Sequence, residues 1–433
     1  MQTNLPLNWC ESTLDDIAEY LNGLAFKPSD WKETGLPIIR IQNLTNPKKE
    51  FNYTTKKFKN EYLIKRGDIL LSWSATLDVF IWQRENAWLN QHIFKVTPKK
   101  HMNDRFVFYI LKNALYELIH SEFLHGSTMK HINRAPFLRH KILLPPLAEQ
   151  ERIVEKIEAL FQDIDEGVER LKSAQAQIKQ YRQSVLKSAF EGKLYKTTDW
   201  KEVSFKDLLA SDKYSMKRGP FGSSLKKEYF TNHGIRVFEQ YNPINNDPYW
   251  KRYYITKEKY EELKAFEAKA GDLLISCSGV TLGRIVELPK DVETGIINQA
   301  LLKLTLNNKK VINSYFIHLF RSPMFQQKIF SQARGAAIQN MLSVSEIKKI
   351  PLYLPTFPEQ QRIVEEIEKR FAVADELEKA VNEGLEKADK LKQSILKKAF
   401  EGKLVAQNPN DEPASILLNR IKKSPNPTKG KKK

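Results

Sequence analysis

Cysteine is scarce in this chain of 433 residues, which contains only Cys10 and Cys277, far apart and neither in a CxxC pair. This excludes a disulfide framework and a zinc knuckle. Long hydrophobic runs are also missing, because no apolar stretch approaches the roughly 20 residues of a membrane span. The start, "MQTNLPLNWC", lacks a basic segment followed by an apolar one. We therefore expect a cytoplasmic chain that does not bind membranes.

The sequence also lacks the common catalytic motifs. It contains no GxxxxGK[ST] phosphate loop, no GxSxG nucleophile elbow and no HExxH metal site. The stretch "DPYW" (247–250) has only one of the two prolines of the adenine-methyltransferase motif, and no glycine-rich cofactor loop precedes it. We interpret this stretch as a turn. The sequence predicts a binding protein that has no catalytic residue, no metal site and no cofactor of its own.

Acidic residues are in the minority, and the net charge of the chain is +18. Lys and Arg exceed Asp and Glu by 6 in residues 1–146, by 9 in residues 195–356 and by 5 in residues 405–433, whereas 147–194 and 357–404 each sum to −1. Two positive blocks and a positive tail are typical of a protein that neutralises the phosphates of a polyanion. The alternative is a generic basic protein whose charge only aids solubility.

One long stretch of the sequence occurs twice, at an offset of 210 residues. Residues 143–194 and 353–404 align without gaps and share 23 of 52 positions, including "SVLKSAFEGKL" and "SILKKAFEGKL". Each copy opens with a proline-containing turn, continues for more than forty residues without proline, and ends at Gly192 or Gly402. The pattern predicts one long helix per copy, a rod of about 60 Å.

Both rods carry apolar residues at the alternating three- and four-residue spacing of a coiled coil. Because 210 residues are thirty heptads, the seam keeps its register between the copies. A second rod that pairs with the first must return antiparallel, which predicts globes at opposite ends related by a pseudo-two-fold axis. The alternative is two helices packed separately on their own domains. The predicted seam consists of Ile157, Leu160, Ile164, Leu171, Ile178, Val185, Ile367, Leu377, Val381, Leu391 and Ile395.

The segments that precede the two rods, 1–146 and 195–356, also resemble each other. "RGDILLSWS" (66–74) matches "AGDLLISCS" (270–278), and "LNQHIFKVT" (89–97) matches "INQALLKLT" (297–305). Short β-type runs precede a helix in each segment, so we predict two divergent copies of one α+β domain. The predicted organisation is a first globe at 1–146, a helix at 147–194, a second globe at 195–356, a helix at 357–404 and a basic, disordered tail at 405–433.

The loops of the two globes differ strongly and carry side chains that suit DNA. Arg and Lys reach guanine edges, Asn and Gln pair with adenine, and Ser and Thr contact base or phosphate. For any single residue, a solvated surface position is the alternative. We expect DNA contacts from Arg40, Asn43, Lys56, Lys57, Ser74, Thr76, His92, Thr128 and Lys130 in the first globe, and from Lys217, Arg218, Ser223, Ser224, Lys226, Arg236, Ser278, Thr281, Arg284, Arg334, Gln339 and Asn340 in the second.

The repeated "LPPLAEQERIVEKIEALF" and "LPTFPEQQRIVEEIEKRF", the endings "SAFEGKL" and "KAFEGKL", and the two variable globes resemble the specificity subunit of type I restriction-modification systems. The resemblance covers roughly residues 1–420. It implies two target-recognition domains that each read one half of an interrupted, asymmetric double-stranded DNA site, with two helices that set the gap. It also implies a non-catalytic subunit that acts in phage defence.

The same resemblance implies partners. Two methyltransferase subunits would bring S-adenosylmethionine and modify adenine, and restriction subunits would bring ATP with magnesium. Contacts to partner helices or to the globes are expected from Ile153, Phe161, Phe190, Ile363, Phe371 and Phe400, for which the intramolecular core is the alternative. Two other functions stay open: the specificity subunit of a methylation-only system, and a coiled-coil scaffold that binds RNA.

Overall fold

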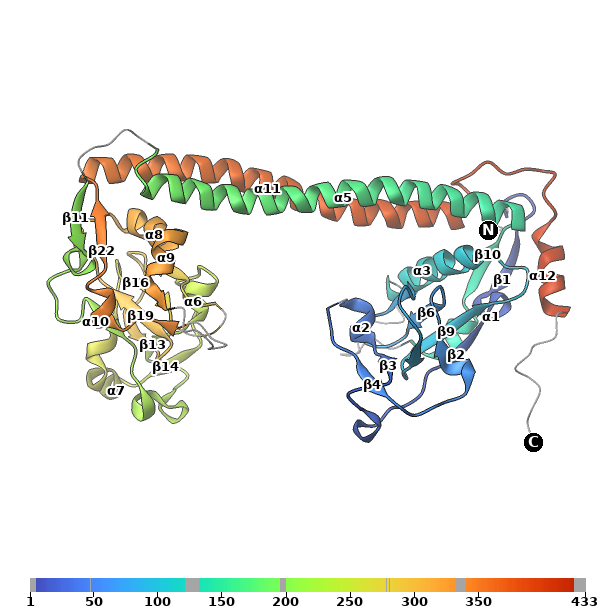
Figure 1. Cartoon of the computed structure of the whole chain (residues 1–433), viewed down its shortest axis with the longest axis horizontal. Coiled ribbons are helices and arrows are strands. Elements are labelled where there is room, and N and C mark those ends of the chain that lie inside the picture. Colours follow the sequence, from blue (N-terminus) through green and yellow to red (C-terminus); the bar gives the residue numbers. More distant parts are fainter. Residues whose placement is uncertain are drawn as a thin grey trace. The chain divides into compact units, whose positions relative to one another are not determined.

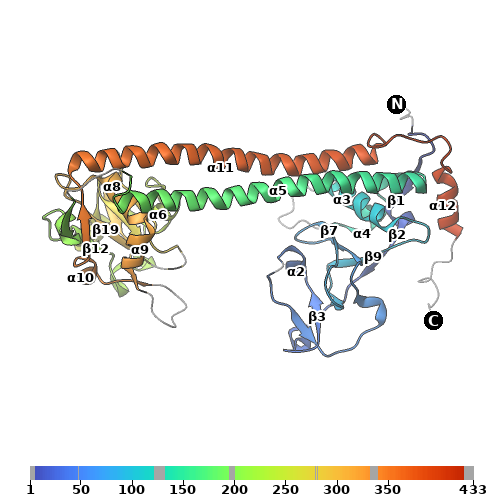
Figure 2. The ribbon, with the colours of Figure 1, turned by 45° about the horizontal axis from the view of Figure 1, so that its top comes forward.

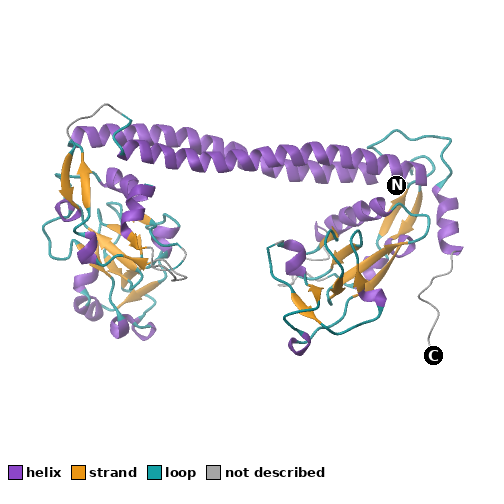
Figure 3. Ribbon diagram, in the orientation of Figure 1, coloured by secondary structure: helices purple, strands orange, loops and turns teal. Residues whose placement is uncertain are grey.

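The structure is a computed structural model that describes residues 5–46, 48–120, 132–194, 200–277, 279, 281–331 and 340–423, with only the backbone at 222, 223, 331 and 340. It divides into two compact units (Figure 1). Unit 1 is Met1–Leu171 with Glu383–Lys433, and unit 2 is Lys172–Asn382. Both units combine strands with helices (Figure 3), which confirms the predicted α+β class.

Unit 1 contains two four-stranded sheets and a short two-stranded one. One pair, β3 with β8, is parallel, and the other pairs within the unit are antiparallel. The inner strand β6 has the sequence ILLS and is buried at all four residues, as expected for a strand covered on both faces. The sheets are β2 (Ala18–Asn22), β9 (Ile93–Pro98), β6 (Ile69–Ser72) and β7 (Asp78–Ile81); β4 (Asn52–Thr54), β3 (Leu36–Ile39), β8 (Ala87–Leu89) and β5 (Leu63–Ile64); and β1 (Cys10–Thr13) with β10 (Lys141–Leu144).

Unit 2 repeats these three sheets strand for strand and adds the pair β20 with β21. Its parallel pair is β13 with β18, and its inner strand β16, LLIS, is again buried throughout. The divergent sequences therefore encode one fold twice. The sheets are β12 (Met216–Arg218), β19 (Leu301–Leu304), β16 (Leu273–Ser276) and β17 (Ile285–Glu287); β14 (Tyr253–Ile255), β13 (Ile235–Phe238), β18 (Gly295–Ile297) and β15 (Glu267–Ala268); β11 (Lys201–Ser204) with β22 (Pro351–Leu354); and β20 (Phe330–Ser331) with β21 (Asn340–Met341).

Helices cover the sheets on the side of the rods. In Figures 1 and 2, α3 (Asp104–His120) lies between α5 (Leu147–Phe190) and the strands of unit 1. In unit 2, α8 (Asn313–Arg321) and α9 (Pro323–Ile329) lie between the rods and the strands. The shorter helices are α1 (Leu14–Ile17), α2 (Ile41–Thr45) and α4 (Arg134–Leu138) in unit 1, and α6 (Tyr241–Ile244), α7 (Lys257–Glu262) and α10 (Val344–Ile347) in unit 2.

The two rods, α5 and α11 (Phe357–Phe400), are continuous helices of 44 residues each. In unit 1, Leu171 lies against Gly384, where an added Cβ would come within 3.0 Å of the leucine side chain. Lys392 pairs with Asp165 at 2.5 Å. From the first contact to the second, the position moves back along α5, from 171 to 165, and forward along α11, from 384 to 392. The two helices are therefore antiparallel.

Unit 2 shows the same direction of packing. Gln175 donates to the Asn382 side chain at 3.3 Å, and Arg182 pairs with Asp375 at 2.5 Å. Farther along α5, Phe190 belongs to the same buried cluster as Ile363 of α11. In both units the helices bury a shared face, as the coiled-coil prediction requires, and do not pack separately on their own domains.

The predicted seam is wrong at Leu377 and Leu391, whose exposed fractions are 53% and 51%. The buried positions of α11 repeat every seven residues from Ile367. A second row of half-buried core positions, with the same spacing, consists of residues 371, 378, 385 and 392. This places Glu378 and Lys392 in the row and each leucine one residue outside it. The error arose because the two core positions hold charged residues and adjacent positions hold leucine. The other predicted seam residues are buried or half-buried.

The six candidate partner contacts lie in the cores of their own units. Ile153, Phe190, Ile363 and Phe400 are each at most 7% exposed, and Phe161 and Phe371 are half-buried against the same clusters. Phe161, for example, makes an edge contact with Tyr109 of α3 at 5.8 Å between ring centroids. The partner role predicted for the four buried residues is therefore corrected: they join each rod to its globe.

The tail prediction is wrong for its first part. Residues 414–423 form α12 (Ala414–Lys423), whose Ala414, Leu417 and Ile421 are buried in the core of unit 1. The spacing of these three residues gives the helix an apolar stripe that a basic composition conceals. The preceding Asp411 is paired with Arg152 at 2.6 Å. Residues 424–433 lie outside the described part of the chain.

Candidate nucleic-acid interface

Each unit contains a backbone frame in which the glycine after the first strand of a sheet packs against an Asn-Gln turn. In unit 1, Gly23 follows β2, and its amide donates to the Ile93 carbonyl at 3.1 Å. A Cβ at Gly23 would stand 2.0 Å from the Asn90 carbonyl oxygen, so only glycine fits. In unit 2, Gly219 follows β12, and a Cβ there would stand 1.8 Å from the Asn298 oxygen. Close backbone approach thus fixes an Asn-Gln turn beside the strand end in both units.

A buried serine shapes the adjoining loop in each unit. Ser276, at the end of β16, donates to the Thr281 carbonyl at 2.6 Å and accepts from the Arg284 amide at 2.9 Å. In unit 1, Ser72, at the end of β6, donates to the Ser74 carbonyl at 3.2 Å. Both serines are fully buried. Their hydroxyls replace water for loop amides and carbonyls, so the loops leave the strands in defined directions.

We call the frame and its adjoining loop the strand-end surface of each unit. In unit 1 it presents Trp73, whose indole donates to Asn22 at 3.1 Å and whose ring lies 4.8 Å from the His92 ring. The Nδ1 atom of His92 is buried and has no hydrogen-bond partner. Gln91 is exposed at the turn, and Thr76 is exposed in the loop after β6. Aromatic and amide groups therefore gather at one edge of the domain.

The strand-end surface of unit 2 holds different side chains on the same frame. Arg218 stands where unit 1 has Asn22, and its guanidinium lies 3.5 Å from the Cys277 carbonyl and 5.5 Å from the Phe221 ring. Cys277 replaces Trp73, and burial raises the pKa of its thiol to about 12, so the thiol stays neutral. Arg284 and Gln299 are exposed. This surface is cationic where that of unit 1 is aromatic.

The structure brings together only some of the predicted contact residues. His92 and Thr76 belong to the strand-end surface of unit 1, and Arg218, Thr281 and Arg284 to that of unit 2. Ser74 lies beside them in the chain but is buried, which corrects the contact predicted for its side chain. Thr128, Lys130, Ser278, Arg334 and Gln339 lie outside the described residues, and the side chains of Ser223 and Asn340 are likewise not described.

Two predicted contacts have internal roles. Asn43 is 4% exposed, accepts from the Arg40 amide at 3.1 Å, and donates to the carbonyls of Lys49 and Glu50. Arg236 is 1% exposed and donates to the carbonyls of Pro248 and Trp250 at 3.0 and 2.8 Å. Burial lowers the pKa of this guanidinium. Both side chains hold loops from within, which corrects the DNA contacts predicted for them.

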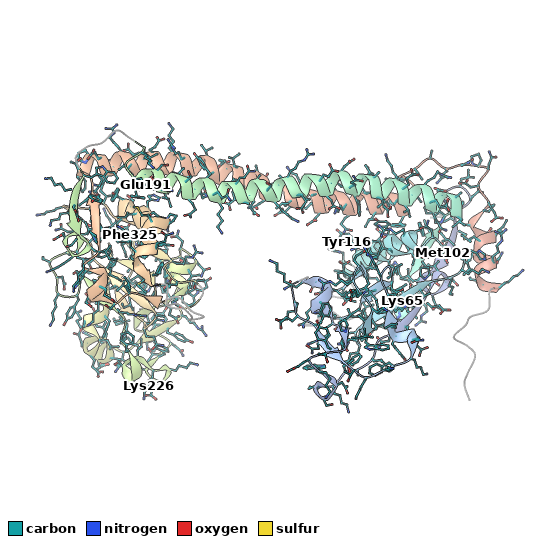
Figure 4. The ribbon with its side chains drawn as sticks, viewed as in Figure 1. Lys65, Met102, Tyr116, Glu191, Lys226 and Phe325 are labelled. Carbon is teal, nitrogen blue, oxygen red and sulfur yellow. The ribbon has the colours of Figure 1, made fainter. Side chains whose placement is uncertain are left out.

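The remaining predicted residues are not part of the strand-end frame, although Lys217 adjoins it in β12. Lys56 is paired with Asp30, and Lys57 beside it is exposed. The Arg40 guanidinium covers the Trp31 ring at 5.6 Å. In unit 2, the Lys217 ammonium lies 5.0 Å from the Phe266 ring. The exposed Ser224 and Lys226 follow β12 in the chain, and Figure 4 places Lys226 at the end of unit 2 farthest from the rods.

Sequence reasoning missed several residues of the strand-end surface. Asn90 and Gln91 recur as Asn298 and Gln299, and this repetition in "LNQHIFKVT" and "INQALLKLT" was a usable signal. It was interpreted only as strand similarity. Phe221 carried no such signal, because an apolar residue within a basic loop attracts attention only once its exposure is known.

Two other kinds of site are absent from the described residues. Among them, no group of three or more His, Cys, Asp or Glu side chains is arranged to hold a metal ion. No helix in the same part of the chain combines the length and apolarity needed to cross a membrane.

Comparison with known proteins gives consistent matches. The family model described as "Type I restriction modification DNA specificity domain" matches residues 6–173 and again residues 198–387. The chain is 27% identical to the type I restriction enzyme EcoBI specificity subunit of Escherichia coli, over 98% of this chain and 94% of the relative. It is also 27% identical to the EcoKI specificity subunit of Escherichia coli, over 99% of this chain and 98% of that relative.

A more distant relative is the MjaVIII specificity subunit of Methanocaldococcus jannaschii, with 23% identity over 94% of this chain and 95% of the relative. Among solved structures, a chain from "Structural basis underlying complex assembly and conformational transition of the type I R-M system" superposes with a TM-score of 0.65. It is 17% identical, and the match covers 93% of this chain and 100% of that one. This likeness supports the fold.

Proposed function

Because the chain belongs to the type I restriction-modification DNA specificity family, we propose that its two units read the two halves of one interrupted, asymmetric DNA sequence. The family assignment makes the chain a DNA sequence-recognition subunit of a type I system. The division of the site between the units, and the surface that reads it, are the proposal. It extends to partners: two methyltransferase subunits that use S-adenosylmethionine, and restriction subunits that use ATP with magnesium.

One observation carries the proposal: the two strand-end surfaces have the same backbone frame and different side chains. Asn22 and Trp73 of unit 1 correspond to Arg218 and Cys277 of unit 2. Base edges in the major groove are distinguished by the donors and acceptors that a protein presents. Two copies of one scaffold with different donors favour two different half-sites, and hence an asymmetric sequence.

The charge distribution supports a duplex as the ligand. The excess of basic residues lies in the two globes and the tail, while the rods are nearly neutral. Positively charged side chains bind the phosphates anywhere along a duplex, whereas specific hydrogen-bond donors are needed only where the bases of a half-site are read. The rods, with 44 residues each, extend about 66 Å at the α-helical rise. We propose that they set the gap between half-sites and dock the methyltransferase subunits.

Methylation sequencing of the host, with and without this gene, tests the proposal. The expected result is an interrupted motif that carries methylated adenine and disappears when the gene is deleted. A genome with unchanged methylation contradicts the proposal. A competition assay with the purified chain adds a second criterion: duplex DNA that contains the motif must compete better than RNA, whereas preferential RNA binding would favour the scaffold alternative.

The exposed glutamines of the two turns form a matched pair of variants. Gln91→Ala should relax the motif only in the half read by unit 1, and Gln299→Ala only in the half read by unit 2. Each lost base contact should cost about 1–3 kcal/mol of discrimination. Either variant serves as the control for the other. Relaxation of both halves by one substitution would show that the units do not read separately.

A further inference from the structure

Phe221 is unusually exposed for an aromatic residue. Its exposed fraction is 66%, the highest among the large hydrophobic side chains in the described residues. It follows Arg218 and Gly219 of the strand-end surface and precedes a short 3-10 helix, Gly222–Leu225. An isolated phenyl ring in water gains nothing for folding, because burial of apolar surface is what stabilises a fold. The exposure therefore suggests contact with a ligand.

The residues before Phe221 hold its backbone in place. Gly219 donates to the Leu301 carbonyl at 2.9 Å and is packed against Asn298, and Pro220 is buried. The backbone of Phe221 itself is extended, with φ −96° and ψ 158°. The Arg218 guanidinium lies 5.5 Å from the ring centroid, a cation–π distance that supports the base of the side chain. The backbone that carries the exposed ring is therefore held in place by its neighbours.

Basic residues flank Phe221 in the sequence, and the Arg218 guanidinium lies beside its ring. Lys217 and Arg218 precede it, Lys226 and Lys227 follow it, and the nearest acid in sequence is Glu228, which pairs with Lys226 at 3.5 Å. Figure 4 shows Lys226 at the tip of unit 2, away from the rods. Two copies of such a surface would repel each other. A ligand that is anionic outside and apolar inside satisfies both the ring and the cations, and duplex DNA has this composition.

Unit 1 offers an internal comparison. Ala25 occupies the position two residues after Gly23 that Phe221 occupies after Gly219. The nearest aromatic residue of unit 1, Phe26, is half-buried and contacts Phe58 edge-on at 5.2 Å. The exposed ring is therefore a feature of one unit and not of the shared fold. Under the proposed function, the Phe221 ring can therefore act only on the half-site read by unit 2.

We propose that Phe221 is an apolar wedge that inserts between two stacked base pairs at the half-site read by unit 2. Apolar side chains that enter a base step unstack it and kink the duplex, and neighbouring cations bind the phosphates beside the step. The wedge would make recognition by unit 2 depend on how easily the step unstacks, a property of sequence that no hydrogen bond reads. This inference rests on the proposed function, because it requires that unit 2 contact duplex DNA.

The test measures unstacking directly in duplexes that contain the motif found by methylation sequencing. 2-Aminopurine is placed at successive positions of the unit 2 half-site, and the full-length chain is added without any methyltransferase subunit, so that base flipping by a partner cannot contribute. The wild-type chain should raise the fluorescence at one step. Phe221→Ala should abolish this rise and weaken binding about tenfold, the scale of a lost aromatic–base contact.

Three variants sharpen the result. Phe221→Trp should retain the fluorescence rise, because a larger aromatic ring can still enter the step. Tyr353→Ala removes another exposed aromatic side chain of unit 2, which is 60% exposed on β22, and should change nothing. Lys226→Ala should reduce the salt dependence of binding, whereas Phe221→Ala should leave the salt dependence intact, since phenylalanine neutralises no phosphate.

The outcomes separate this inference from the proposed function. If the wild-type chain does not bind the motif duplex, the proposed function fails. If it binds with a fluorescence rise that Phe221→Ala preserves, or with no rise at any position, the wedge is refuted and the proposed function stands. Unchanged DNA binding by Phe221→Ala, together with weaker assembly with a methyltransferase subunit, would assign the ring to a protein contact and also refute the wedge.

Discussion

At the scale of single residues, two glutamines explain part of the most strongly repeated stretch of the sequence. Gln360 is fully buried, accepts from the Ile312 amide at 2.9 Å, and donates to the carbonyls of Lys310 and Pro355. Gln150, equally buried, reaches the Asn103 amide at 3.4 Å and the Pro145 carbonyl at 3.0 Å. One amide group thus fixes the start of each rod to the start of a globe helix.

Replacing Gln360 should destabilise unit 2 more than its position in a polar motif suggests. Gln360→Leu removes three hydrogen bonds to backbone groups, one of them fully buried, and we expect a loss of about 3 kcal/mol. Hydrogen exchange of the peptides around residues 310–320, with the urea midpoint, provides the measurement. Gln361→Leu is the control, because Gln361 is exposed on the same turn. Equal exchange in the two variants would show that the amide does not anchor the rod.

The candidate site was predictable in residue type more than in position. Polar loop residues were expected to face DNA, and Thr76 and Arg284 are exposed as expected. Asn43 and Asn90 could not be distinguished by sequence, since both are asparagines in short polar stretches of one domain, although Asn43 lies in α2. Asn43 is turned inward by three hydrogen bonds to its own loop. These partners are residues 40, 49 and 50, so the orientation depends on how the local backbone folds back on Asn43, which residue type alone does not reveal.

At the scale of elements, the rods could be predicted almost completely and the sheets could not. A heptad pattern is local, so it gave the helices and their pairing, and it failed only where charged residues occupy the seam. The strand order β2-β9-β6-β7 joins segments that are up to about eighty residues apart. Pairing between short, distant strands leaves no periodic signal, although the duplicated sequence did indicate that both globes would share it.

The C-terminal helix gives a prediction at this scale. Leu417 is 3% exposed in the core of unit 1, so Leu417→Ala should cost about 3 kcal/mol. Because the Ala414 amide donates to the Asn8 carbonyl, faster exchange should appear in the peptides that contain residues 5–17. Ile416→Ala, at a position 42% exposed on the same helix, should have little effect. If both variants exchange alike, α12 does not stabilise the N-terminal strand.

At the scale of the whole molecule, the charge pattern and the rods predict separate roles: the globes bind DNA and the rods set the gap. One experiment can test this separation. Under the proposed function, phosphate contacts by either globe bind DNA without regard to spacing, so we expect the rods to make affinity depend on the gap. Deleting one heptad from α5 (172–178) together with the facing heptad of α11 (379–385) preserves the pairing of the helices. The rods become shorter by about 10 Å.

Methylation sequencing of this double-deletion strain should recover both half-sites unchanged and a gap shorter by about three base pairs, the number that spans 10 Å of duplex. Three base pairs also rotate one half-site by more than a quarter turn around the duplex, so affinity for the new site should be lower than for the original. A single deletion in α5 is the control, because it leaves seven residues of α11 without a partner and should abolish methylation. An unchanged gap in the double deletion would mean that something other than the length of the rods sets the spacing.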